Sequence, residues 1–71
     1  MIKLGDTVNV SYGQTTKMWL VSNNNLKRFA KDHPEYKGLH FVVMGFIPGK
    51  GWYTAANGTL KAMRAYIKGK M

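Results

Sequence analysis

Apolar and polar side chains alternate strictly through residues 7–12, which is the pattern of a half-buried strand. A turn-like Gly13-Gln14-Thr15 separates this stretch from a second apolar segment at residues 17–21. Trp19 and Val21 would share one face of that second strand. We therefore predict that the chain begins with a β-hairpin.

The longest apolar run covers residues 39–47 and is followed by Pro48-Gly49-Lys50-Gly51 and then by Trp52 and Tyr53. This order predicts a third strand, a tight hairpin turn and a fourth strand that starts at Trp52. Apolar residues occupy both faces of the third strand, so both faces need cover. One face would carry Leu39, Phe41, Val43 and Ile47, and the other Val42, Met44 and Phe46.

Two segments have the spacing of amphipathic helices. Ser22 and the three asparagines after it can cap a helix that starts near residue 24 or 25, and Pro34 should end it. Leu26, Phe29 and Ala30 would form its apolar face.

The second helix is predicted over residues 60–68, with Leu60, Met63 and Ile67 on its apolar face and Gly69 as its stop. A polar turn at residues 54–59 should precede it, with Asn57 or Thr59 as the cap. The competing interpretation is a β-hairpin through Asn57-Gly58, but the residues that follow alternate poorly and have low strand preference.

These elements predict one domain, residues 1–71, of the α+β class, with a four-stranded, mainly antiparallel sheet and two helices in the order ββαββα. Each half contains a tryptophan, an asparagine-containing turn and a helix, at a separation of about 33 residues. A duplicated ββα unit and chance similarity both explain this pattern. If the helices cover one face of the sheet, a partner or a second copy in a homodimer would have to cover Val42, Met44 and Phe46.

The charge of the chain favours an anionic partner. Eleven Lys and Arg residues against three Asp and Glu give a formal charge of +8 and a pI near 10.1. Six of the bases and none of the acids lie in residues 36–71. Positive charge of this size and distribution attracts polyanions.

The sequence offers little for catalysis or metal binding. There is no cysteine, and His33 and His40 have neither helical pairing nor convergent carboxylates. The three carboxylates form no evident acid and base pair, so we expect neither an enzyme nor a cofactor. The turn at Gly49 does not have the spacing of a phosphate-binding loop, and it leads into a strand rather than a helix.

No segment approaches the roughly 20 apolar residues that cross a bilayer, and the N-terminus has no stretch like a signal peptide. The absence of cysteine fits a reducing compartment. We therefore expect a soluble, cytoplasmic protein without a membrane partner.

The leading hypothesis is a small basic protein that binds nucleic acid, through the hairpin tip and the basic side of the last helix. DNA is preferred over RNA, because paired aromatics of the kind found on RNA-binding sheets are not evident. Trp52 taken alone is favoured as a core residue. The predicted contact residues are Lys50, Trp52, Tyr53, Lys61, Arg64, Lys68 and Lys70.

The alternative hypothesis is a protein-protein interaction module or inhibitor, of the size of a phage or mobile-element accessory protein. Its basic surface would dock on an acidic patch of a protein partner, and Val42, Met44 or Phe46 would supply apolar anchors.

Overall fold

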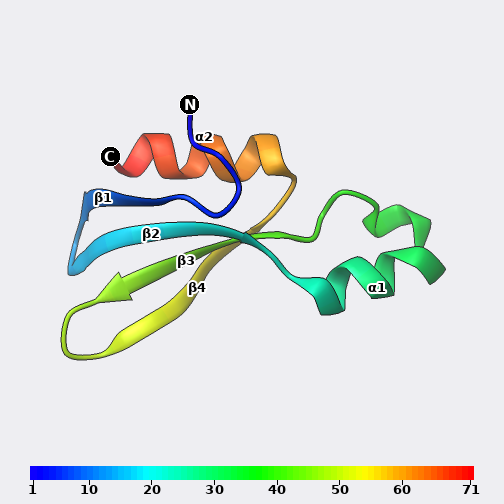
Figure 1. The fold of residues 1–71 in the computed structure, drawn as a ribbon, viewed down its shortest axis with the longest axis horizontal. Helices are drawn as coiled ribbons and strands as arrows, with labels where there is room; N and C mark the ends of the chain where they lie inside the picture. Colours follow the sequence, from blue (N-terminus) through cyan, green and yellow to red (C-terminus); the bar gives the residue numbers. More distant parts are fainter.

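The computed structural model describes residues 1–71 and contains one four-stranded antiparallel sheet and two helices (Figure 1). The strand order is β1-β2-β3-β4, so each strand pairs with its neighbours in sequence. The predicted α+β class and the order ββαββα are confirmed. The elements are β1 (Thr7–Tyr12), β2 (Thr15–Ser22), α1 (Asn24–Asp32), the 3₁₀ turn η1 (Pro34–Tyr36), β3 (Phe41–Ile47), β4 (Gly51–Gly58) and α2 (Leu60–Lys70).

The hydrophobic core lies between α2 and one face of the sheet. Met63 and Ile67 of α2 are buried against side chains of three strands. Because side chains alternate along a strand, this core uses every second residue of β2 and β3. The buried residues of the cluster are Val10, Met18, Leu20, Val43, Met63 and Ile67.

Helix α2 starts as the sequence predicts and ends later. The Thr59 hydroxyl accepts a hydrogen bond from the Ala62 amide at 3.1 Å, so Thr59 is the N-cap. The prediction that Gly69 ends the helix is wrong, because the helix continues to Lys70. Neither helix of the structure combines the length and apolarity that a membrane crossing requires.

Helix α1 has the predicted bounds but not the predicted packing. The Asn23 side chain accepts hydrogen bonds from the amides of Asn25 and Leu26, and the helix ends before Pro34. The helix buries none of its residues and projects beyond the end of the sheet (Figure 1). Only α2 therefore covers a face of the sheet, and the two ββα halves share an element order without sharing a packing arrangement.

The predicted polar turn at residues 54–59 is also wrong, because β4 runs to Gly58. Val43 pairs with Ala56 and Met44 with Thr54, so Ala55 is an extra, bulged residue in β4. Ala, Asn and Gly have low strand preference, yet pairing along β3 keeps the segment extended. Ala55 and Ala56 pack against the core.

A glycine in the middle of β3 makes room for an aromatic ring on the core side of the sheet. Gly45 pairs with Tyr53, and a Cβ added at Gly45 would lie 2.6 Å from two carbons of the Tyr53 ring. The Tyr53 hydroxyl forms a 2.6 Å hydrogen bond with the hydroxyl of the buried Thr15. The absence of a side chain at residue 45 therefore allows the ring to reach β2.

We predict that Gly45→Ala lowers the free energy of unfolding by about 1–3 kcal/mol, because the added methyl group displaces the Tyr53 ring. Urea denaturation followed by far-UV circular dichroism measures this change. Gly69→Ala is the control: it lies in α2 with no atom near its Cβ position and should leave stability unchanged or raise it by up to about 1 kcal/mol. Equal stability of Gly45→Ala and the wild type would contradict this packing arrangement.

Candidate nucleic-acid interface

No helix packs along the face of the sheet opposite α2, and Val42 is the one buried residue on that face. Met18, Leu20 and Val43 face α2, so the residues that alternate with them lie on the other side. Strand register joins Trp19 to Met44 across β2 and β3, and Phe46 to Trp52 across β3 and β4. We call this side the open face, and its residues are Thr7, Asn9, Lys17, Trp19, Val21, Val42, Met44, Phe46, Trp52, Thr54 and Asn57.

Three aromatic side chains from three neighbouring strands meet on the open face. The ring centroids of Trp19 and Trp52 are 5.8 Å apart, and those of Phe46 and Trp52 are 5.1 Å apart. Trp19 is 39% exposed and Trp52 46% exposed, whereas Phe46 is partly buried between them and its neighbours. We call these three residues the aromatic platform.

The position of Trp52 differs from the more favoured prediction, which placed it in the core. The core side of the sheet is already filled by α2, and Trp52 lies on the opposite side from Tyr53. The predicted pair of contact residues, Trp52 and Tyr53, is therefore split between the two faces. Tyr53 holds Thr15 on the core side, and Trp52 remains accessible to a ligand.

The turn between β3 and β4 presents Lys50 to solvent at one end of the sheet. The Lys50 amide donates to the Ile47 carbonyl at 3.0 Å, with Pro48 in the second position and Gly49 at φ 85° in the third. This combination is typical of a type II turn, which needs a positive φ at that position. The glycines therefore serve the backbone of the turn, and the prediction of an exposed hairpin tip at Lys50 is confirmed.

The open face has one lysine and no acidic residue, and a second lysine stands in the turn beside it. Lys17 pairs with Phe46 across β2 and β3, and Lys50 follows β3 in the adjoining turn. Both lysines are exposed. None of the four strands contains an acidic residue, so no carboxylate offsets these charges on the open face.

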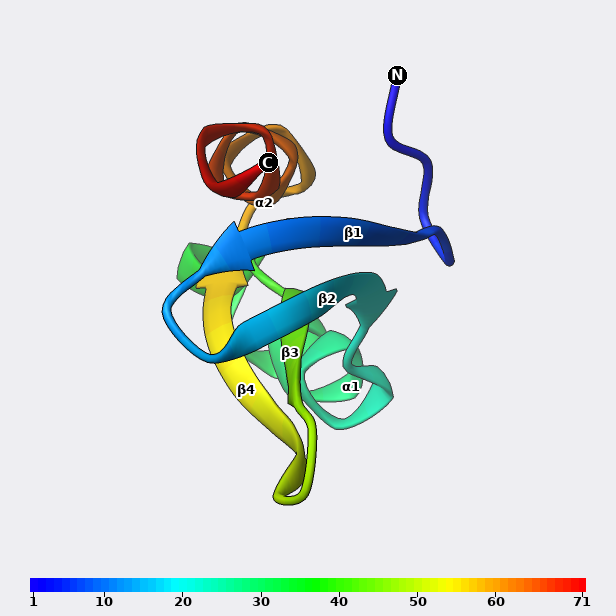
Figure 2. The same cartoon turned by 90° about the vertical axis from the view of Figure 1, so that its left-hand side faces the viewer.

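The predicted basic residues of α2 do not join this surface. Figure 2 shows α2 on one side of the sheet and the β3–β4 turn reaching away from it on the other side. Lys61 and Lys68 are exposed on α2. Lys70 lies over the ring of Tyr12, with Nζ 4.1 Å from the ring centroid. The structure thus separates the hairpin tip from the basic side of the last helix.

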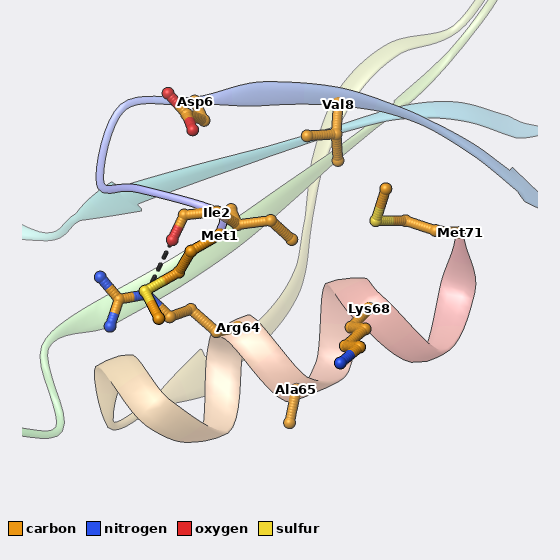
Figure 3. Close-up of a pocket in the computed structure, with 8 residues that line it drawn as sticks. All are labelled: Met1, Ile2, Asp6, Val8, Arg64, Ala65, Lys68 and Met71. Atoms are coloured by element: carbon orange, nitrogen blue, oxygen red, sulfur yellow. Dashed lines mark hydrogen bonds between the residues drawn. The ribbon is translucent and has the colours of Figure 1, made fainter.

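Arg64 has a structural contact with the N-terminal segment. Its Nε donates to the Ile2 carbonyl at 2.8 Å and joins α2 to the segment before β1. Figure 3 shows Arg64 beside Met1 and Ile2, at the edge of a cavity of about 540 Å³ that Lys68 also lines. Nearby on α2, burial raises the pKa of the Tyr66 hydroxyl, and Tyr12 and Tyr53 add to the shift.

Sequence reasoning did not include Trp19 and Phe46 among the contact residues. The sequence places each of them in a strand, and Phe46 on the less covered face of its strand, but it does not place either beside Trp52. The missing information is the register of β2 against β3 and of β3 against β4, which brings the three aromatics together. Their spacing in sequence shows none of this, because they belong to three different strands.

Comparisons with known proteins found nothing similar to this chain: no protein-family model matches it, and neither does any curated protein or solved structure. No three His, Asp or Glu side chains lie close enough together to hold a metal ion.

Because both tryptophans of the chain belong to the aromatic platform, their fluorescence reports its exposure directly. We predict that acrylamide quenches the emission of the ligand-free protein efficiently at low and high protein concentration alike. An emission maximum that shifts to the blue as concentration rises, with loss of quenching, would show instead that a second copy covers the open face.

Proposed function

We propose that the protein binds single-stranded nucleic acid on its open face, without catalysing a reaction. The observation that carries this proposal is the aromatic platform on the uncovered side of a four-stranded sheet. Sheets that bind single strands use exposed aromatic rings in this way, because every base has a face on which a ring can stack.

The charges beside the platform suit the phosphates of such a strand. Lys17 lies next to Phe46 in the sheet, and Lys50 lies two residues before Trp52 in the turn. Lysines at these positions can contact phosphates while neighbouring bases stack on Trp19 and Trp52. The net charge of +8 draws the polyanion toward the protein over a longer range.

The platform favours a single strand over a duplex, because bases inside a duplex are already stacked on each other and offer no free face. The sequence-based preference for DNA over RNA depended on the lack of visible paired aromatics, and Trp19, Phe46 and Trp52 remove that reason. We therefore propose both single-stranded DNA and single-stranded RNA as ligands, to be ranked by direct comparison.

A protein-binding module is the second candidate function, favoured by the apolar character of the same face. Met44 and Phe46 are half-buried beside two accessible tryptophans, and tryptophan is common among the residues that dominate protein interfaces. Capture of partners from lysate with and without nuclease separates the two candidates. A stoichiometric protein partner that survives nuclease would favour this second function.

We predict that Trp52→Ala weakens binding of a single-stranded oligonucleotide by about 1–3 kcal/mol, or roughly 5- to 150-fold, because one stacked base loses its partner. Fluorescence anisotropy of a labelled oligonucleotide at low salt measures the affinity. Since Trp52 is half-exposed, the variant should keep the circular dichroism spectrum of the wild type. Unchanged affinity of the folded variant would contradict stacking at this position.

A matched pair of charge reversals tests whether the open face or the overall charge attracts the ligand. Lys50→Glu and Lys61→Glu change the net charge equally, and both side chains are exposed, but Lys61 lies on α2. We expect Lys50→Glu to weaken binding several-fold more than Lys61→Glu. Equal losses would show that only the net charge matters.

A further inference from the structure

The part of the chain from Asn24 to Tyr36 forms a lobe whose residues contribute nothing to the core. Phe29 and His33 stack with ring centroids 4.0 Å apart, and Tyr36 packs edge-on to Phe29 at 5.3 Å. These contacts hold α1 to η1. The lobe projects from the end of the sheet that lies away from the β3–β4 turn (Figure 1). Its surface residues can therefore serve a ligand without a cost to the core.

A concave site lies between α1 and the segment that returns the chain to β3. Its volume is about 390 Å³, and it is lined by Lys27, Lys31 and Lys37 together with Ala30, Pro34 and His40. The methylene stems of the lysines, Ala30 and Pro34 give it an apolar floor, and three ammonium groups lie on these stems. Such a site suits an anion with an apolar part.

The lysines of this site form no salt bridge with an acidic side chain. The only close contact of an acidic side chain with a basic one joins His33 Nδ1 to Glu35 Oε1 at 3.6 Å, so neither Asp32 nor Glu35 pairs with a lysine. His40 lines the same site, and its Nδ1 is buried without a hydrogen-bond partner. Three unpaired ammonium groups around one hollow create a local positive potential.

The spacing of residues along α1 connects this site with the open face. A second cavity, of about 300 Å³, lies on the open face and is lined by Met44 and Thr54 of the sheet and by Asn23 and Asn24 at the start of α1. Residues three and seven positions apart share one side of a helix, so Lys27 and Lys31 follow Asn24 along α1. A chain that crosses the open face and reaches Asn24 is thereby led to the lysines.

We propose that the lobe site binds phosphates of the same single strand that stacks on the aromatic platform, with Lys27, Lys31 and Lys37 as the contacts. This inference rests on the proposed function and extends the binding path from the β3–β4 turn to the opposite end of the molecule, whose longest dimension is 37 Å. The lysines supply charge for phosphodiester groups, and the apolar floor accepts the sugar or base between them.

Two oligonucleotides of different length separate the platform from the lobe. An oligothymidylate of about four nucleotides should occupy the platform and quench tryptophan emission, and one of about twelve should reach the lobe as well. The wild type should bind the longer strand more tightly and with a steeper dependence on salt.

Lys27→Glu/Lys31→Glu tests the lobe, and Lys61→Glu/Lys68→Glu on α2 is its control, with the same change of net charge at exposed residues. For the short strand, the lobe variant should lose no more affinity than the control does. It should lose at least tenfold more affinity than the control for the long strand. Its slope of log K against log salt should fall by about 1.4, the value for two phosphate contacts on a single strand.

The outcomes distinguish the two proposals. If the short strand quenches tryptophan emission and the lobe variant binds the long strand as well as the control does, the lobe site is wrong and the proposed function stands. If neither strand quenches the emission of the wild type, the proposed function fails, and the lobe inference fails with it.

Discussion

A sheet has two faces, and in this protein only one of the two helices packs against the sheet. Helix α2 packs on one face through Met63 and Ile67, and the main cluster of buried residues forms there. Helix α1 packs on η1 through Phe29 and Tyr36 and buries none of its residues, so no helix covers the other face, where Val42 alone is buried. The exposure of Trp19 and Trp52 follows directly from this arrangement. An uncovered face with half-exposed tryptophans is unusual for a protein without a ligand or partner.

The face of the sheet that no helix covers is also free of acidic residues. The strands contain no acidic residue. Asp6 lies before β1, and Asp32 and Glu35 lie in the lobe. The open face therefore combines apolar rings with positive charge, a combination that suits a single-stranded nucleic acid better than a purely apolar protein surface. The basic residues of α2 lie on the other side of the core, where Arg64 and Lys70 already make contacts within the protein.

Local sequence signals predicted the elements well, because alternation, capping residues and turn residues act over short distances. Residues 7–12 alternate and form β1, and Asn23 caps α1 where the asparagines indicated. The signals failed where pairing overrides local preference, as in the last half of β4, where Ala55 to Gly58 stay extended against β3. They also failed for Gly69, because one glycine near the end of a helix costs too little to stop it.

The candidate site was only partly predictable for a related reason. Lys50 stands in a turn whose residues identify it, so its exposure could be read from the sequence. The aromatic platform depends on the register of three strands and on the failure of α1 to pack, and neither leaves a local signal. The large area that a tryptophan usually buries favours a core position for Trp52, whereas in the structure the core face belongs to Tyr53 and α2.

If the open face receives a single strand, amide and indole chemical shifts of the protein will show this residue by residue. In a titration of ¹⁵N-labelled protein with an oligothymidylate, the account predicts large shifts of the Trp19 and Trp52 indole N–H signals, with smaller shifts at Lys17 and Lys50. The exposed residues of α2, such as Lys61, should stay unshifted. Shifts that gather on α2, or indole signals that do not move at saturating oligonucleotide, would contradict the account.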